Sequence, residues 1–289
     1  MKTLLASVVL LSLGAPLGAQ ITMAPASPHA QIEQQVGLAT VTLDYSRPGV
    51  KGREVFGKLE PYGRVWRTGA NASTKLGFDR DVQFGGEDVP AGTYALYTIP
   101  GEREWTLILS TNIELWGAGG YDAAQDLLRL TVPVTPLESL QETLTLDFTG
   151  FHDNGADFVL RWEHVELSVP VFVDSDAEVF RQIDEHVRNA EGEVSAQAYF
   201  AAGAFYFEKN RDLPQAAAWM EQAVEGAPHA FWMVYARAEV ARAMGDDALA
   251  LEWAERAHGM VADAPNDYGY LAKSQMLIDE LKSAGRAGR

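Results

Sequence analysis

The sequence predicts a mixed β and α protein of two domains, an antiparallel β-sandwich followed by an α-helical array of hairpins. Three observations predict this fold class. Short segments of alternating apolar and polar residues, separated by turns about every ten residues, fill the chain up to Val173. At Asp174 the apolar spacing changes from two residues to three and four. Beyond that point the chain repeats with a period of 34 residues.

Composition excludes several classes of function. A chain of 289 residues is long enough for two domains that each have a core. Its net charge of −17 argues against nucleic acid as a bulk partner, because phosphate binding needs a basic face. The chain has no cysteine, which removes disulfides, thiolate metal sites and cysteine nucleophiles. Its six histidines lack the HxH and HExxH spacings of zinc sites, so we expect no metal and no cofactor.

Residues 1–19 have the pattern of a secretory signal peptide. Lys2 supplies a positive charge, and a ten-residue apolar run follows from Leu4 to Leu13. This run is too short to span a bilayer. We expect cleavage after Ala19, with Ala24-Pro25-Ala26 as a second small-x-small site. The sequence therefore predicts an exported protein, periplasmic or secreted, with no membrane span in the mature chain.

The β-sandwich is expected over residues 27–173, with a barrel as the alternative. Alternation from Val36 to Tyr45 predicts a half-buried strand. The segments TYALYTI and EWTLILS are rich in aromatic and β-branched residues, and Pro100-Gly101 separates them, which predicts a hairpin. Further strands are predicted over residues 76–78, 82–84, 127–134, 142–148 and 157–173.

The helical domain is expected over residues 174–285. Asp174-Ser175-Asp176 is a helix N-cap signal, and apolar residues then recur at helical spacing. At this offset of 34 residues the notable pairs of identical residues are four: Asp212 with Asp246, Ala216 with Ala250, Trp219 with Trp253, and Ala223 with Ala257. This period resembles the tetratricopeptide repeat, whose helix pairs stack into a solenoid. Only two copies are visible, neither has that repeat's early tryptophan-leucine-glycine signature, and a helix over residues 268–281 is expected to cap the stack.

A basic, glycine-rich stretch interrupts the strands of the first domain. From Asp44 to Lys75, seven Lys and Arg residues stand against three Asp and Glu residues, a local charge of +4 in an acidic protein. Five glycines and two prolines between Tyr45 and Thr74 exclude a long helix and predict a folded loop with many turns.

This stretch also carries a family resemblance. Several short segments occur together and in order: YSRP at 45–48, VKGR at 50–53, PYG at 61–63, WRTGAN at 66–71, AGTY at 91–94, IP at 99–100, EWT at 104–106 and WG at 116–117. Together they resemble the bacterial family known as domain of unknown function 2911, over residues 27–173, and some members carry a helical tail like this one. The resemblance implies an exported, β-rich domain and assigns no catalytic residue.

The chemistry of the basic stretch permits two interpretations, of which the sequence favours the first. The first is a structural clasp, in which arginines pair with nearby acids such as Asp44, Glu54, Glu60, Asp79 and Asp81. The second is a site for a small anion or an acidic sugar, because guanidinium forks suit carboxylates and phosphates. The candidate residues for that site are Tyr45, Arg47, Lys51, Arg53, Trp66, Arg67 and Asn71. Trp66, Trp105, Trp116 and Tyr121 would form a platform for sugar rings if they were exposed together.

These observations favour a non-enzymatic function. We expect an exported module that binds a small anionic or carbohydrate ligand at the basic stretch and a protein or peptide partner at the helical tail. The alternative is a hydrolase acting on a sugar or a phosphate ester, with arginines stabilising the developing charge. The sequence assigns no catalytic residue, since no serine lies in a GxSxG motif and no histidine lies beside a plausible nucleophile.

Overall fold

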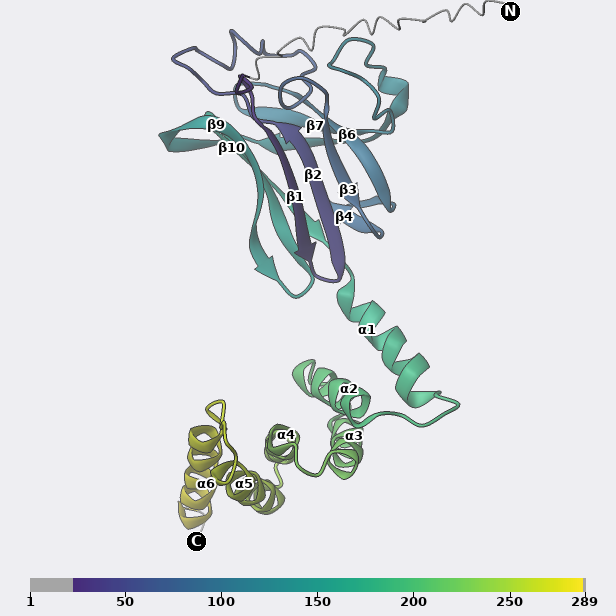
Figure 1. Cartoon of the computed structure of the whole chain (residues 1–289), viewed down its shortest axis with the longest axis vertical. Helices are drawn as coiled ribbons and strands as arrows, with labels where there is room; N and C mark the ends of the chain where they lie inside the picture. The colour runs from purple at the N-terminus through teal and green to yellow at the C-terminus, as the bar shows by residue number, and fades with distance from the viewer. Residues whose placement is uncertain (1–22, 288–289) are drawn as a thin grey trace, which may run out of the picture. The chain divides into compact units, whose positions relative to one another are not determined.

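A computed structural model describes residues 23–287 of the protein. The predicted signal peptide, residues 1–19, lies outside the described residues. The described chain divides between Asp174 and Ser175 into two compact units. We call them the β unit and the helical unit (Figure 1).

The β unit consists of two antiparallel sheets. Six strands form the larger sheet in the order β1-β2-β3-β6-β7-β8, and four form the smaller one in the order β5-β4-β10-β9. The strands of the larger sheet are β1 (His29–Val36), β2 (Ala39–Ser46), β3 (Thr74–Phe78), β6 (Gly92–Ile99), β7 (Glu104–Ser110) and β8 (Asp126–Pro133). Those of the smaller sheet are β4 (Val82–Phe84), β5 (Glu87–Val89), β9 (Thr135–His152) and β10 (Gly155–Phe172).

One apolar core lies between these sheets. Leu43 and Leu76 enter it from the larger sheet, and Leu146 and Phe158 enter it from the smaller one, all at most 1 % exposed. Burial in β2 alternates between buried and partly exposed positions, as the period-two pattern predicts. The predicted antiparallel β-sandwich is therefore confirmed.

Two strands of the smaller sheet are long and irregular. In β10 the register shifts on both sides of Glu163, whose φ is +56°. The chain turns back there, and the backbone N–H of Val173 donates to the carbonyl of Asn154 at 2.7 Å. β9 and β10 thus form a bent hairpin whose bend places Glu163 beside the basic stretch.

The helical unit begins with α1 (Ser175–Ile183), which continues into one π-helical turn over Asp184–Arg188. Two antiparallel pairs follow, α2 with α3 and α4 with α5, and α6 packs on α5. Their bounds are α2 (Ala196–Glu208), α3 (Leu213–Gly226), α4 (Phe231–Ala243), α5 (Asp247–Ala262) and α6 (Tyr270–Ala287). The helical tail and the mixed β and α fold class are therefore confirmed.

Small residues let the paired helices approach closely. Ala216 is fully buried, and a Cβ added to Gly203 of α2 would lie 3.0 Å from the Ala216 carbonyl oxygen of α3. The second helix of each pair begins at an aspartate N-cap, Asp212 for α3 and Asp246 for α5. Within residues 23–287, no helix has both the length and the apolar character needed to cross a membrane.

Candidate anion-binding site

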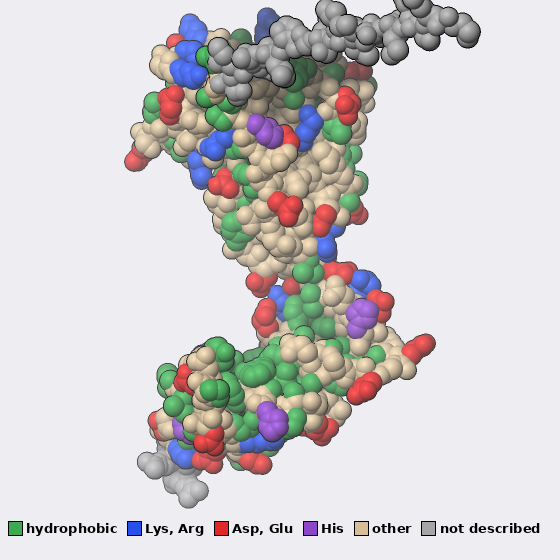
Figure 2. All heavy atoms as spheres, in the orientation of Figure 1, with side chains coloured by type: hydrophobic (Ala, Val, Ile, Leu, Met, Phe, Trp, Pro, Cys, Tyr) green, Lys and Arg blue, Asp and Glu red, His purple; other side chains and the backbone are tan. Residues whose placement is uncertain are grey.

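The basic loop, residues 47–73, joins β2 to β3 and is tied to the β unit by main-chain hydrogen bonds. At its start, the N–H of Val50 donates to the carbonyl of Glu142 in β9 at 2.7 Å. Near its end, Trp66 and Thr98 of β6 exchange two backbone hydrogen bonds of 2.7 and 2.9 Å. Figure 1 shows this loop at one end of the sandwich, and Figure 2 shows basic side chains gathering at that end. Because neighbouring strands fix both ends, the loop can hold side chains in defined positions.

A side chain of β10 fastens the middle of the basic loop. The Glu163 carboxylate accepts hydrogen bonds from the backbone N–H groups of Val55 and Phe56, at 3.1 and 3.4 Å. Charge-assisted bonds of this kind are stronger than those between neutral groups. The bend in β10 thus serves to bring a carboxylate to a turn that would otherwise leave two donors without partners.

Beneath the loop lies a cluster of buried aromatic rings. Trp66 stacks on Trp162 with ring centroids 5.5 Å apart, and Phe56 meets Trp105 edge to face at 4.6 Å. All four side chains are at most 5 % exposed. Trp66 and Trp105 therefore belong to the core rather than to an exposed sugar platform, and of the four aromatic residues considered for one, Trp116 alone is strongly exposed, at 73 %.

Two candidate site residues hold β9 instead of facing a cavity. The Tyr45 hydroxyl donates to the Leu146 carbonyl at 3.1 Å and is buried. Arg47 donates from Nε to the Leu144 carbonyl at 3.0 Å and from Nη2 to the Thr145 hydroxyl at 2.8 Å. Their donors are thus engaged by the neighbouring strand.

Asn71 also has a structural position. Its side-chain amide donates to the Ser46 hydroxyl at 3.1 Å, and its φ of +63° lies in the left-handed region, where asparagine is one of the few tolerated residues. Asn71 is therefore a turn residue that closes the basic loop onto β2.

The remaining three candidates, Lys51, Arg53 and Arg67, meet at one hollow, which we call the basic cavity. Its volume is about 230 Å³. Glu60 is the one carboxyl-bearing residue among those that line it. The lining consists of Ala26, Ser27, Pro48, Gly49, Lys51, Arg53, Leu59, Glu60, Arg67, Gly69, Ala70 and Trp162.

Local backbone oxygens position two of these cations. Arg53 donates from Nε to the Val50 carbonyl at 3.0 Å and from Nη2 to the Gly49 carbonyl at 2.6 Å. Lys51 donates from Nζ to the Ala26 carbonyl at 3.0 Å. These acceptors are neutral carbonyls, and the Glu142 carboxylate of β9 accepts from the backbone N–H of Lys51 at 2.9 Å.

Arg67 differs because its guanidinium has no acceptor among the described residues. Its Nε atom is buried without a hydrogen-bond partner. Its Nη1 atom lies beside Gly117, where an added Cβ would be 3.5 Å away. The expected pairing of Arg47, Arg53 and Arg67 with carboxylates is wrong, since no ion pair within the described residues involves any of the three.

Glu60 lies on the turn that Glu163 fastens. Its backbone N–H donates to the Val55 carbonyl at 2.9 Å, and its carboxyl forms no hydrogen bond within the described chain. Burial raises the pKa of this carboxyl to about 7, although the charges of Arg67 and Arg53 act in the opposite direction. Near neutral pH the group is thus present in both protonation states.

The candidate set omitted several residues of the basic cavity. From the sequence, Glu60 was considered only as an ion-pair partner for one of the arginines. Trp162, which also lines the cavity, is more than 90 residues further along the chain and comes from a strand predicted for its apolar pattern. No spacing rule connects a loop residue to a ring in β10. The bend at Glu163 brings them together.

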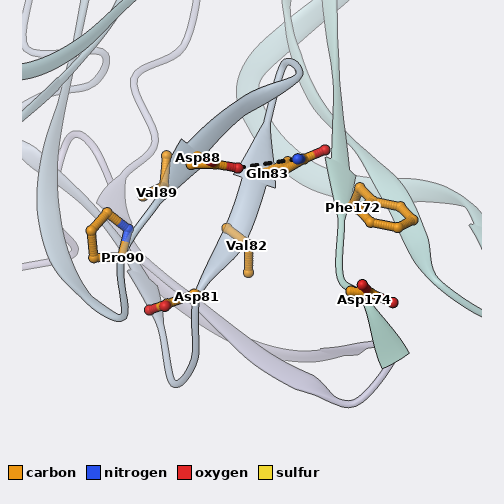
Figure 3. A pocket seen from close by; sticks show the side chains of 8 residues that line it. All are labelled: Asp81, Val82, Gln83, Asp88, Val89, Pro90, Phe172 and Asp174. Atoms are coloured by element: carbon orange, nitrogen blue, oxygen red, sulfur yellow. Dashed lines mark hydrogen bonds between the residues drawn. The ribbon is translucent and has the colours of Figure 1, made fainter. Parts of the chain in front are cut away.

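Two other hollows have different chemistry. Figure 3 shows one of about 450 Å³ near β4, β5 and the end of β10, lined in part by Asp81, Asp88 and Asp174. Its carboxylates lie on different sides, and Asp88 accepts from Gln83 at 3.1 Å. Within the described residues, no group of three or more His, Asp and Glu side chains is placed to hold a metal ion.

The third hollow belongs to the helical unit. It has a volume of about 500 Å³ and lies where the turn between α3 and α4 meets the start of α2. Trp232, which is 38 % exposed, and Pro228 contribute apolar surface to it. Its lining has no Lys, Arg, Asp or Glu, so it differs from the basic cavity in character.

Comparison with known proteins identifies the β unit. The model of a family described as Protein of unknown function (DUF2911) matches residues 27–171. The match includes both the basic loop and the strand that carries Trp162. No curated protein matches the chain.

Proposed function

Because the chain belongs to the DUF2911 family, whose description names no activity, we propose a function from the site itself: the protein is a non-enzymatic binding module. The basic cavity of the β unit receives a small anion or the acidic group of a sugar. The helical unit offers a surface to a protein or peptide partner. The protein acts outside the cytoplasm, after export directed by residues 1–19.

The observation that carries the proposal is the unsatisfied guanidinium of Arg67. A buried donor without a partner costs about 1–3 kcal/mol, more when it is charged. Arg53 and Lys51 add positive charge at the same cavity, and neither is paired with a carboxylate within the described chain. An anion would supply the acceptor that Arg67 lacks and would be attracted by all three cations.

The size of the basic cavity limits the ligand. Its volume of about 230 Å³ is below the range of about 300–1,000 Å³ typical of drug-sized ligands. Sulfate, a small carboxylate or a single acidic sugar is of suitable size. Trp162 borders the cavity from the core and is 1 % exposed, so the polar and charged groups of the loop would make most of the contacts to such a ligand.

Hydrolysis at the same cavity is the second candidate function, and Glu60 is the observation that favours it. A carboxyl with a pKa of about 7 suits general acid or base chemistry at neutral pH. Most glycoside hydrolases, however, use two carboxyl groups at the reacting bond, and the lining has one. Turnover of nitrophenyl phosphate or nitrophenyl glucuronide that disappears in Glu60→Gln would favour hydrolysis over binding.

Thermal-shift screening tests anion binding. We expect sulfate, D-glucuronate or a related anion to raise the melting temperature, with a stabilisation of about 2.7 kcal/mol at 100 times Kd. Arg67→Ala should lose this effect, and Arg64→Ala, which removes an exposed arginine of the same loop, should keep it. A ligand that stabilises wild type and Arg67→Ala equally would rule out the role of Arg67.

The partner surface of the helical unit needs its own test. The support for it is the exposed apolar surface that includes Trp232, and Figure 2 shows hydrophobic side chains gathering over this unit. Short concave arrays of helix pairs commonly bind peptides. Peptides selected on the whole protein should lose affinity for Trp232→Ala and keep it for Met276→Ala, which removes an exposed apolar side chain of α6.

Export can be tested by sequencing the mature N-terminus. A protein processed after Ala19 begins at Gln20 and is recovered from the periplasm or the medium. Recovery of the unprocessed chain in the cytoplasmic fraction would contradict this part of the proposal.

A further inference from the structure

Glu60 creates a conflict inside the basic cavity. Any anion bound there shares a space of about 230 Å³ with the Glu60 carboxyl. An ionised carboxylate would repel that anion, and the repulsion is stronger away from bulk water. A protonated carboxyl instead offers an O–H donor to the anion. The protonation state of Glu60 therefore decides whether the cavity attracts an anion with its full positive charge.

The bound anion acts back on Glu60. In the free protein, the positive charges of Arg67 and Arg53 favour the ionised carboxylate, while burial favours the neutral acid. A bound anion offsets those positive charges and excludes water from the carboxyl. Both changes raise the affinity of Glu60 for a proton. Anion binding and proton binding therefore assist each other, as linkage requires.

We propose that the basic cavity takes up its anion together with one proton, which Glu60 holds, so that Glu60 makes capture of the anion dependent on pH. This inference rests on the proposed function and adds its regulation. It predicts tight binding in mildly acidic surroundings and release as the pH rises above neutral.

The charged groups around the basic cavity come from the loop and from both long strands. Lys51, Arg53 and Arg67 line it, and the Glu142 carboxylate of β9 accepts from the backbone N–H of Lys51 at 2.9 Å. From β10, Glu163 faces the same turn, and its carboxylate is held by two backbone N–H groups. No histidine is among the described residues that line the cavity.

Calorimetric titration with sulfate and with D-glucuronate tests the proposal. Neither anion titrates near neutral pH, unlike phosphate, whose second pKa is about 6. For wild type we expect Kd to rise about tenfold for each pH unit above 7, up to about pH 8.5. Titrations at about pH 8 in buffers of different ionisation heat should show uptake of nearly one proton per anion.

Variants of Glu60 isolate its contribution. Glu60→Gln keeps a neutral side chain of the same shape, so its Kd should stay low across this range and its proton uptake should be close to zero. Glu60→Ala should also lose the proton uptake. Agreement between the two variants would show that the loss comes from removing the carboxyl and not from a packing defect in one of them. Glu54→Gln removes an exposed carboxyl of the same turn and should retain the wild-type pH dependence.

Two results would overturn the proposal, and they differ in what they leave standing. If wild type binds sulfate or D-glucuronate with the same Kd at every pH and without proton uptake, the role of Glu60 is wrong and anion binding stands. If neither anion binds to wild type at any pH, the proposed function fails and this inference fails with it.

Discussion

Arg67 and Glu60 are the two residues on which the site depends. One is a cation without an acceptor, and the other is a carboxyl without a donor, at the same cavity. Charged groups in such positions usually pair with each other, yet no ion pair joins these two in the described chain. The Nε atom of Arg67 is buried and unsatisfied, and such a group calls for an explanation, which a bound anion would supply.

The elevated pKa of Glu60 makes a prediction about stability. The pKa is about 7 in the folded protein and 4.5 ordinarily, so between these values the folded state binds more protons than the unfolded state. The free energy of unfolding should therefore fall as the pH rises from about 4.5 to 7. Above about pH 7, Glu60 should cause no further change in the free energy of unfolding. Urea unfolding at several pH values, without added anions, should show a flatter profile for Glu60→Gln. If wild type and Glu60→Gln had identical profiles of unfolding free energy against pH, the raised pKa of Glu60 would be contradicted.

Residue types alone predicted the basic loop but only part of its site. Of the seven candidates, Lys51, Arg53 and Arg67 line the basic cavity, while Tyr45, Arg47, Trp66 and Asn71 hold the loop in place. An arginine that binds a ligand and one that binds a carbonyl of β9 look alike in a sequence. Their difference depends on which strand lies beside each one.

At the scale of elements, the bend of β10 organises the site. It places the Glu163 carboxylate on two N–H groups of the loop and the Trp162 ring beside the cavity. The clasp interpretation is thus correct in one respect: the loop is fastened to the sandwich. The fastening uses backbone groups, the hydrogen bonds of Arg47 to neutral acceptors in β9, and the carboxylates of Glu163 and Glu142. It does not use the arginine–carboxylate pairs expected for Arg47, Arg53 and Arg67.

Removing the Glu163 side chain should loosen the loop. Glu163→Ala leaves two partly buried N–H groups without acceptors, which should lower the free energy of unfolding by about 1–3 kcal/mol. It should also weaken anion binding, because the turn that carries Glu60 loses its support. Urea unfolding and anion titration would measure both effects, with Glu138→Ala, an exposed glutamate of β9, as the matched control. Unchanged stability would show that the carboxylate does not hold the turn.

The repeated N-caps give a prediction for the helical unit. Asp246 accepts from the backbone N–H of Leu249 at 3.0 Å, and Asp212 accepts from Gln215 at 3.2 Å. Asp246→Ala should lower the free energy of unfolding by about 1 kcal/mol, whereas Asp246→Ser should largely retain it. Chemical denaturation followed by circular dichroism would test this. Equal loss in both variants would mean that the cap hydrogen bond is not the cause.

The elements themselves were predictable where their pattern was strong. The hairpin expected from TYALYTI and EWTLILS is present as β6 and β7, paired from Ala95 with Ser110 to Ile99 with Thr106. By contrast, β1 (HAQIEQQV) escaped prediction because polar residues occupy most of its positions, as suits the edge strand of a sheet. The bend at Glu163 was also missed, since a left-handed glutamate has no signature in the sequence.

At the scale of the whole molecule, each unit has its own apolar core. The core of the β unit includes Trp105 and Phe158, and the helical unit has separate clusters around residues such as Met220 and Ala250. The change of pattern at Asp174 already indicated two kinds of packing in one chain. Chains built in this way commonly unfold in more than one step.

Residues 23–174 produced alone should therefore fold and bind anions. We expect the fragment to unfold cooperatively and to match the anion affinity of the whole protein, because the basic cavity is lined by residues of the β unit only. Urea unfolding and calorimetry on the fragment would test this. A fragment that is folded but no longer binds would show that the helical unit contributes to the site.

The central claim is that the unpaired guanidinium of Arg67 holds an anion in the basic cavity. Calorimetric titration with sulfate at low ionic strength and mildly acidic pH tests it most directly. We predict a single site in wild type and in Arg64→Ala, and an affinity lower by about tenfold to a hundredfold in Arg67→Ala. Absence of binding in wild type, or equal affinity in Arg67→Ala, would contradict the claim.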